Sequence, residues 1–322
     1  METPKISIII PIYNVELYIE KCLHSLFSQT LNDLEYIFVN DCTPDRSIEI
    51  LQRVLLKYPN RKSQVVLINR ARNGGQVAAR TDGMKVATGE FMIHCDPDDW
   101  IEPDMYETMY KTAKDNCADV VICDAISHFP DHDEQMIWDD LCEADDWLKH
   151  RMDIWWGLWN RLVRTSIIKD NNIYPFPDIN LTEDMNIMMR VYYYAKKFAN
   201  VHRYLYHYNR MNENSALKNA KSLDKYMQRL NSAKGIDEFF KAHDFEAGNY
   251  WYQFKQSIRD CLFDYNAWDI WLQYFTDIND AKGRNLLYRL AYKLANNGCL
   301  LPLKIIVKLK KINNDIYNCT GI

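Results

Sequence analysis

Short runs of Val, Ile and Leu alternate with segments of helical periodicity between residues 6 and 95. Alternation of this kind is typical of a mostly parallel sheet covered by helices. The predicted strands span residues 6–11, 34–39, 65–68 and 91–95. The first helix is expected to be capped by Asn14, the second to begin after Pro44, and the third to end near Gly89. The sequence therefore predicts an α/β fold.

Polar residues gather where these strands end. Asp41 follows the second strand, the segment 70–75 (RARNGG) follows the third, and the segment 95–100 (CDPDDW) follows the fourth. Ligands of open α/β sheets bind beyond the carboxyl ends of the strands. The side chains expected to line one crevice there are those of Asp41, Arg72, Asp96 and Asp98.

The chain has 322 residues, 48% of them hydrophobic, and a formal net charge of -5. It is long enough to bury a sizeable core, so we expect a globular protein. The acidic balance argues against a nucleic-acid partner, because affinity for nucleic acids rests largely on basic residues that neutralise phosphates. From about residue 218 the pattern becomes helical, which predicts one domain over 1–217 and a helical extension over 218–322.

The nine cysteines form no CxxC pair and no zinc-type spacing with histidine, which favours reduced thiols. The apolar run over 6–12 is too short for a secretory signal and suits a buried strand better. No segment approaches the roughly 20 apolar residues of a membrane span. We therefore expect a cytoplasmic protein that is not integral to a membrane.

Asp96, Asp98 and Asp99 stand close together after a buried strand, where carboxylates repel one another unless a cation or hydrogen bonds offset the charge. Mg²⁺ and Mn²⁺ prefer oxygen ligands and commonly bridge one or two carboxylates to substrate phosphates. The segment is either such a metal site or an acidic turn that caps the next helix. Asp41, likewise, either contacts a ligand or accepts backbone hydrogen bonds in a turn.

Two arginines near these acids offer guanidinium donors for a diphosphate. They are Arg72 and Arg80, and each is alternatively an ordinary surface arginine. Gly74 and Gly75 either let the backbone approach the ligand closely or only shape the turn. The order of all these features along the chain carries more weight than any one of them.

In that order the motifs resemble family 2 of the inverting glycosyltransferases, which has the GT-A fold. The resemblance covers roughly residues 4–216. It rests on SIIIPIYN (7–14), VNDCTPD (39–45), NGG (73–75) with AR (79–80), ATGE (87–90), DPDDW (96–100), WNRL (159–162), TED (182–184) and YHY (206–208). The set is highly specific because its members occur together and in sequence.

The resemblance implies a nucleotide-sugar donor site. Asp41 would contact the nucleotide base, Asp96 would lie near the ribose, and Asp98 would bind a Mn²⁺ or Mg²⁺ ion on the diphosphate. The donor-binding residues that it implies are Pro11, Tyr13, Asp41, Arg72, Arg80 and Asp96.

The resemblance also implies a base for the reaction. Asp184 would deprotonate the acceptor hydroxyl, with Glu183 as the alternative, although both acids also stand where they would favour a helix N-terminus. Some relatives use a histidine late in this domain as a further metal ligand. His207 is placed suitably, but a histidine between tyrosines is alternatively a packed side chain.

The implied reaction is a single displacement that inverts the anomeric carbon of a sugar such as a UDP-linked hexose. The acceptor would be a hydroxyl of a glycan or of a lipid-linked molecule in polysaccharide assembly. Cys42, Pro97 and the pair Thr81 and Asp82 depart from the usual family pattern, and they leave the donor preference open. None of these departures removes a carboxylate with an assigned role.

Other functions remain as alternatives. A catalytically inactive, sugar-nucleotide-binding homologue or scaffold would keep the fold, although the presence of Asp41, Asp98 and Asp184 together disfavours it. A dinucleotide-dependent oxidoreductase is disfavoured because no Gly-x-Gly-x-x-Gly turn follows the first strand. A sugar nucleotidyltransferase is disfavoured because its Gly-rich, basic first loop is absent.

Two further segments carry open hypotheses. Trp155, Trp156 and Trp159 either offer flat apolar rings to an acceptor or belong to the core. The segment 282–312 contains eight basic residues and no acidic one. Its last helix would either attach the protein peripherally to an anionic membrane or dock on the domain with a solvated basic face. In the membrane interpretation the apolar area comes from Leu303, Ile305, Ile306, Val307 and Leu309.

Overall fold

The computed structural model describes residues 3–138, 156–177, 179–212, 222–278, 281 and 284–312. The chain divides into two compact units. The first comprises Met1–Asp145 and Trp156–Ala220, and the second comprises Asp146–Trp155 and Lys221–Ile322. The predicted boundary between residues 217 and 218 lies close to this division, in a part of the chain outside the described residues.

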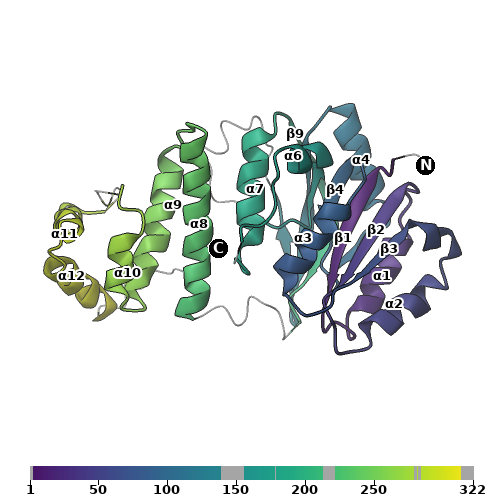
Figure 1. Ribbon diagram of the computed structural model, residues 1–322, viewed down its shortest axis with the longest axis horizontal. Helices are drawn as coiled ribbons and strands as arrows, with labels where there is room; N and C mark the ends of the chain where they lie inside the picture. The colour runs from purple at the N-terminus through teal and green to yellow at the C-terminus, as the bar shows by residue number, and fades with distance from the viewer. Residues whose placement is uncertain are drawn as a thin grey trace. The chain divides into compact units, whose positions relative to one another are not determined.

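The first unit is built of alternating strands and helices (Figure 1). In chain order they are β1 (Ile6–Ile12), α1 (Ile19–Phe27), β2 (Leu34–Asn40), α2 (Ser47–Leu55), η1 (Pro59–Gln64), β3 (Val65–Asn69), α3 (Gln76–Val86), β4 (Phe91–His94), β5 (Trp100–Ile101), α4 (Met105–Asp115), β6 (Val120–His128), β7 (Asp133–Met136), β8 (Arg161–Arg164), α6 (Thr165–Asp170), α7 (Glu183–Tyr194) and β9 (Phe198–Asn209).

The strands form one sheet in the order β3-β2-β1-β4-β8-β6-β9-β5, with β7 paired to β6. The first four are parallel to one another, and β1, which is buried along its whole length, lies between β2 and β4. Its sequence ISIIIPI suits this position because branched apolar side chains pack well on both faces of a covered sheet. The predicted α/β fold is confirmed.

Helices cover both faces of the parallel strands. The chain steps from β1 to β2 and β3 in one direction, then returns past them to β4. Because parallel crossovers are right-handed, α1 and α2 lie on one face and α3 lies on the other. In α3, a Cβ on Gly83 would lie 2.6 Å from Cγ2 of Ile9. Glycine at this position therefore lets α3 approach β1 closely.

The four predicted strands correspond to β1, β2, β3 and β4. The expected cap at Asn14 is wrong, because Asn14 has a left-handed φ of 53° and α1 begins only at Ile19. The strands from β5 onward were not predicted. Most of them pair with segments distant in the chain, and β6 joins β9 through register shifts around Asp124.

The described part of the second unit is helical. Its elements are α8 (Leu223–Ala242), α9 (Asn249–Asp260), η3 (Cys261–Phe263), α10 (Trp268–Gln273), α11 (Leu286–Asn296) and α12 (Leu301–Ile312). The Arg259 guanidinium is buried 3.8 Å from the ring centroid of Trp271 and donates a 2.9 Å hydrogen bond to Asn296. These contacts join α9 to α10 and α11.

Two expectations about the whole chain can be compared with this structure. No helix within the described ranges is long and apolar enough to cross a membrane. Six described cysteines are free, among them the exposed Cys42, Cys117 and Cys299. Cys261, by contrast, is disulfide-bonded, so the expectation of reduced thiols is wrong at this position.

Candidate active site

The predicted site residues follow the carboxyl ends of β1, β2 and β4, which are neighbours in the sheet. Pro11 lies within β1 and is buried, whereas Tyr13, just after the strand, is 48% exposed. Asp41 follows β2, and Asp96 and Asp98 follow β4. The sheet topology therefore gathers these residues at one edge, where ligands of this class of sheet bind.

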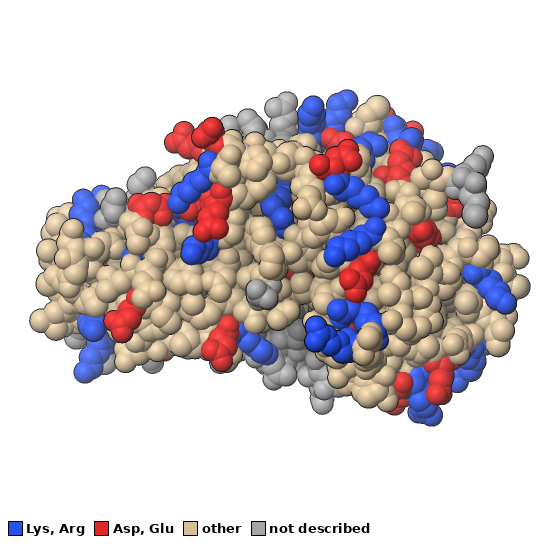
Figure 2. Space-filling view, viewed as in Figure 1, with Lys and Arg blue, Asp and Glu red and all other residues tan. Residues whose placement is uncertain are grey.

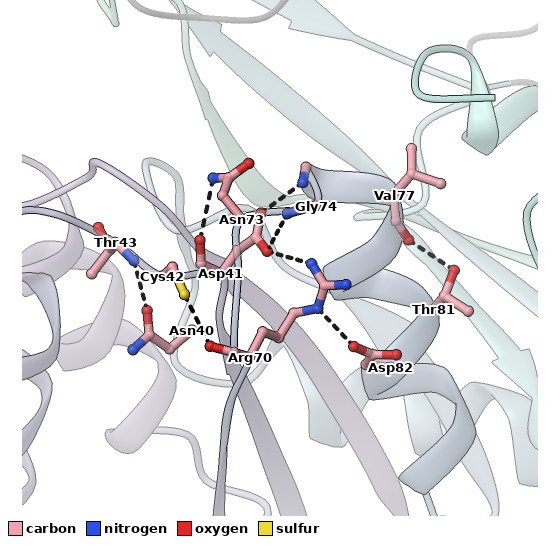
Figure 3. A network of polar contacts seen from close by, with 11 residues as sticks. Asn40, Asp41, Cys42, Thr43, Arg70, Asn73, Gly74, Val77, Thr81 and Asp82 are labelled. Carbon is pink, nitrogen blue, oxygen red and sulfur yellow. Dashed lines mark hydrogen bonds and ion pairs between the residues drawn. The ribbon is translucent and has the colours of Figure 1, made fainter. Parts of the chain in front are cut away.

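Asp41 is the centre of a polar network between β2 and the loop that precedes α3 (Figure 3). Its carboxylate is 2% exposed and accepts hydrogen bonds from the backbone N–H groups of Gly74 at 2.9 Å and Gly75 at 2.8 Å. It also forms an ion pair with Arg70, whose Nε donates to Asp82 at 2.8 Å. Asp41 thus holds the glycine loop closed over the end of β2.

Arg70 belongs to this polar network and was missed by sequence reasoning. The predicted Arg72 is exposed and makes no hydrogen bond or ion pair with the described residues. A register signal distinguishes the two arginines, because Asn40 pairs with Asn69 across β2 and β3. The residues that follow, Asp41 and Arg70, therefore emerge side by side, and the Arg70 N–H donates to the Asn40 carbonyl at 3.0 Å.

Cys42, one of the residues that depart from the pattern expected from the resemblance, has an unusual backbone conformation. Its φ of 56° lies in the left-handed region that glycine adopts without strain. The thiol donates to the carbonyl oxygen of Arg70 at 2.9 Å. This contact adds a second link between Asp41's turn and the loop that contains Arg70.

Arg80, on α3, joins Asp96, which follows β4, to the start of α7, where the predicted base lies. One of its terminal nitrogens, Nη2, donates to Oδ1 of Asp96 at 2.5 Å, and the other, Nη1, pairs with Glu183 at the start of α7. The arginine is buried, and although burial opposes its charge, Asp96 and Glu183 raise its pKa above the ordinary value. Burial raises the pKa of Glu183 to about 6, against the opposing effect of Arg80. Arg80 is therefore part of a buried charge cluster and is no ordinary surface arginine.

Asp184 stands beside Glu183 in the first turn of α7. Thr182, just before them, has a left-handed φ of 62° and makes no side-chain capping hydrogen bond. The acidic side chains in this first turn are Glu183 and Asp184. Asp184 Oδ1 accepts the Met185 N–H at 2.8 Å, while Oδ2 accepts no hydrogen bond from the described residues. Burial raises the pKa of Asp184, and the negative charge of Asp96 adds to this effect. Asp184 thus lies close enough to sense Asp96 and keeps an oxygen for a ligand.

Asp98 and Asp99 are held by the end of β9. Tyr206 donates to Asp99 Oδ2 at 2.6 Å, and the Asn209 N–H donates to Asp99 Oδ1 at 2.7 Å. Asn212 donates to Asp98 Oδ2 at 2.8 Å. Burial, followed by the neighbouring charge of Asp96, raises the pKa of Asp98 to about 6. The supporting residues Asn209 and Asn212 were not predicted from the sequence.

His207 lies next to this segment, opposite Trp100 across β5 and β9. Its Nε2 is 2.8 Å from Glu102 Oε1 and its Nδ1 is 2.9 Å from His128 Nε2. The ring stacks on Trp100 with centroids 5.2 Å apart. Both ring nitrogens therefore have partners in this structure, and metal binding by His207 stays a prediction. The described residues contain no group of three or more His, Cys, Asp or Glu side chains arranged for a metal.

The hypothesis that tryptophans bind the acceptor can be compared with the structure for two of the three residues. Trp159 is buried and stacks on Tyr206 with ring centroids 4.3 Å apart, and Trp156 is also buried. Both therefore pack in the core of the first unit, Trp159 against Tyr206, which donates a hydrogen bond to Asp99, and Trp156 beside Tyr192 of α7. Trp155 lies outside the described residues.

Comparison with known proteins decides the family. The sequence model of the protein family "glycosyl transferase family 2" matches residues 7–164 of this chain. The glycosyltransferase EpsJ of Bacillus subtilis (strain 168) is 33% identical over 242 residues, which are 72% of this chain and 69% of EpsJ. The chain belongs to glycosyl transferase family 2. A second relative of this family in the same organism, EpsH, is 34% identical over 218 residues, 65% of this chain and 61% of EpsH.

A solved structure extends the likeness to the whole fold. The crystal structure of Staphylococcus aureus TarS 1-349 in complex with UDP-GlcNAc covers 98% of this chain, and this chain covers 93% of it, with a TM-score of 0.67. The sequence identity is 20%, so the likeness concerns the fold. It confirms the predicted GT-A architecture for this member of the family.

Proposed function

We propose that this glycosyltransferase moves a sugar from a UDP-linked donor to an acceptor hydroxyl with inversion of the anomeric carbon. The observation that carries the proposal is the buried Arg80 bridge between Asp96 and Glu183. It fixes the start of α7, and with it Asp184, beside the acids that follow β4. One cluster therefore contains groups suited to the donor and a group suited to the acceptor.

The donor part of the proposal assigns the nucleotide to the edge of the sheet beyond β1, β2 and β4. TarS, a poly(ribitol-phosphate) β-N-acetylglucosaminyltransferase, has been crystallised with UDP-GlcNAc, and its fold supports a UDP-linked donor here. Asp41 would meet the base, with Pro11 and Tyr13 alongside, and Asp96 would lie near the ribose. The amides of Gly74 and Gly75 and the Arg70 guanidinium hold Asp41 in place for this role.

The acceptor part assigns the proton to Asp184. Its free Oδ2 can accept the proton of an acceptor hydroxyl while that oxygen attacks the anomeric carbon from the face opposite the leaving nucleotide. The C–O bond to the acceptor forms as the bond to the diphosphate breaks, and no covalent enzyme intermediate is needed. The raised pKa of Asp184 suits a base, because a weaker acid holds the transferred proton better. We propose a glycan or lipid-linked acceptor and a cytoplasmic site of action.

The same residues fit a divalent cation. Asp96, Asp98 and Asp99 follow β4 in close succession, and burial, followed by the charge of the neighbouring carboxylates, raises the pKa of Asp98 and Asp99. Mg²⁺ and Mn²⁺ commonly need only one or two protein carboxylates when substrate phosphates complete the set, so Asp98 would suffice as the principal ligand. When bound, the ion would neutralise charge on the departing diphosphate. Arg80 is already paired with Asp96 and Glu183. A cation that neutralises the diphosphate would therefore have to come from outside this described cluster.

A donor screen tests the proposal. Nucleotide sugars are offered singly with Mn²⁺, and thermal stabilisation, slow hydrolysis and transfer to polyol or glycan acceptors are measured. Stabilisation by UDP and a UDP-sugar, lost when the metal is chelated, is the expected result. Proton NMR of the first product then reports its anomeric configuration. Retention of configuration, or equal stabilisation by every nucleotide without metal, would overturn the proposal.

A further inference from the structure

The second unit exposes an unusual amount of apolar side chain on its last two helices. We call this the α11–α12 surface and define it by six residues with exposed fractions between 48% and 73%. They are Leu286, Leu287, Leu290, Leu294, Leu301 and Ile305. The two helices pack against each other, so these side chains belong to one region. In Figure 2 the molecule over α11 and α12 is mainly tan, with charged side chains, blue and red, toward its edges.

The exposure is not explained by the packing of α11, whose opposite face is already buried. Tyr288, Ala291, Tyr292 and Ala295 form that inner face. The outer face would ordinarily be polar in a helix that covers a core, yet it presents four leucines. Single exposed leucines are common on protein surfaces. A contiguous group of them marks a surface that binds another protein or a membrane.

The structure also corrects where the apolar area lies. From the sequence, Leu303 and Val307 were expected to supply it, but both are buried within the second unit. Of the α12 residues proposed then, Ile305 is exposed and Ile306 is half-buried, and the side chain of Leu309 lies outside the described residues. The leucines of α11 provide most of the surface.

Basic residues accompany this apolar group. The segment 282–312 has eight Lys or Arg residues and no Asp or Glu, in a chain of net charge -5. Lys293, Lys304 and Lys308 are exposed on the same two helices. An apolar stripe flanked by lysines matches the boundary between the anionic head groups and the acyl chains of a membrane.

We propose that the α11–α12 surface binds the surface of an anionic lipid bilayer, with the leucines entering the head-group region and the lysines contacting lipid phosphates. A second copy of the chain fits less well. In a symmetric dimer the same patch faces itself, so the basic residues of both copies would be brought together without a counter-charge. Lysine is also depleted in protein interfaces, whereas it is favoured beside anionic lipid.

Vesicle sedimentation with the full chain tests this proposal. The probe is vesicles of phosphatidylcholine with phosphatidylglycerol, compared with phosphatidylcholine alone. We expect binding only to the anionic vesicles, weaker at high salt, and reduced about tenfold by Leu287→Gln with Leu294→Gln. The matched control is Leu17→Gln with Leu56→Gln, two leucines of the first unit that are 81% and 80% exposed. The control pair should bind as the wild type does.

Charge and self-association complete the test. Lys304→Gln with Lys308→Gln should weaken vesicle binding and its salt dependence together, and circular dichroism should show every variant folded. No binding of the wild type to anionic vesicles would overturn the proposal. So would equal binding of the two leucine pairs. Sedimentation equilibrium without lipid tests the alternative that a second copy of the chain covers this surface. That alternative would be correct if the wild type does not bind vesicles but forms a dimer, and if Leu287→Gln with Leu294→Gln dissociates the dimer.

Discussion

Arg80 and Glu183 form a buried ion pair although 103 residues separate them in the chain. The pair fastens the first turn of α7 to α3, and the second Arg80 nitrogen fastens α3 to Asp96. The side chains of both acids are largely buried, so water screens their charges only weakly. The predicted donor side and the predicted base are therefore parts of one electrostatic unit.

Arg80→Met should destabilise the protein strongly. The substitution preserves the length of the apolar stem but leaves Asp96 and Glu183 without their shared cation, and breaking a buried pair in this way costs about 3–5 kcal/mol. Urea unfolding measures the loss. The matched control is Arg72→Met, which should change the free energy of unfolding by less than about 0.5 kcal/mol because Arg72 is exposed. Similar losses in the two variants would contradict the assigned role of Arg80.

Asp41 and Asp82 both contact Arg70, but their removal should have unequal effects. In Asp41→Asn the amide group faces donors from Arg70, Gly74 and Gly75, and a buried donor left without an acceptor costs about 1–3 kcal/mol. Asp82→Asn removes a more exposed partner and should cost under about 1 kcal/mol. Only Asp41→Asn should also weaken UDP binding. Calorimetry and urea unfolding on both variants check this, and a larger effect from Asp82→Asn would reverse the assignment.

The sequence was sufficient to predict the positions of those candidate site residues that directly follow a predicted strand. Asp41, Asp96 and Asp98 could be placed because each follows a strand whose apolar pattern is clear, and parallel strands end at the same edge. Arg70 was missed because choosing between it and Arg72 requires the register of β2 with β3. A register shift of one residue reverses the direction of a side chain, and local patterns do not determine it.

Contacts between distant segments lay beyond sequence reasoning. Asn209 supports Asp99 across 110 residues, and it belongs to β9, which pairs with β6 through register shifts. The apolar area of the proposed membrane contact was likewise assigned from the sequence to side chains of α12, of which Leu303 and Val307 are buried. Helical periodicity offered Leu303 and Val307 as readily as the leucines of α11, and only tertiary packing separates the buried set from the exposed one.

Asp98→Asn should make the free protein less sensitive to pH. Burial raises the pKa of Asp98 from an ordinary 3.8 to about 6, so between these values the folded state binds more protons than the unfolded state. The free energy of unfolding therefore falls as the pH rises through this window. Between pH 5 and 7.5 the Asp98 contribution is about 1 kcal/mol, and Asp98→Asn should remove it. Urea unfolding at the two pH values measures the difference, and an unchanged pH slope would contradict the assignment.

The same variant should lose metal-dependent nucleotide binding. In wild type, UDP with Mn²⁺ is expected to raise the melting temperature, whereas chelation should abolish most of the shift. In Asp98→Asn the shift should be small with or without Mn²⁺, although the free variant is at least as stable as wild type near neutral pH. A loss of binding without a loss of stability separates a ligand role from a structural one. A normal Mn²⁺-dependent shift would remove Asp98 from the metal site.

Asp184→Asn should separate catalysis from the structure of α7. Asparagine keeps an oxygen that can accept the Met185 N–H, so the first turn and the neighbouring Arg80 pair should survive. It cannot take a proton from the acceptor, and transfer should fall by roughly two to four orders of magnitude, the usual contribution of a general base. UDP binding should be nearly normal. Glu183→Gln is the comparison: it breaks the buried pair with Arg80, so it should reduce stability as well as turnover. If Asp184→Asn transfers sugar at close to the wild-type rate while Glu183→Gln is folded and inactive, the base is Glu183.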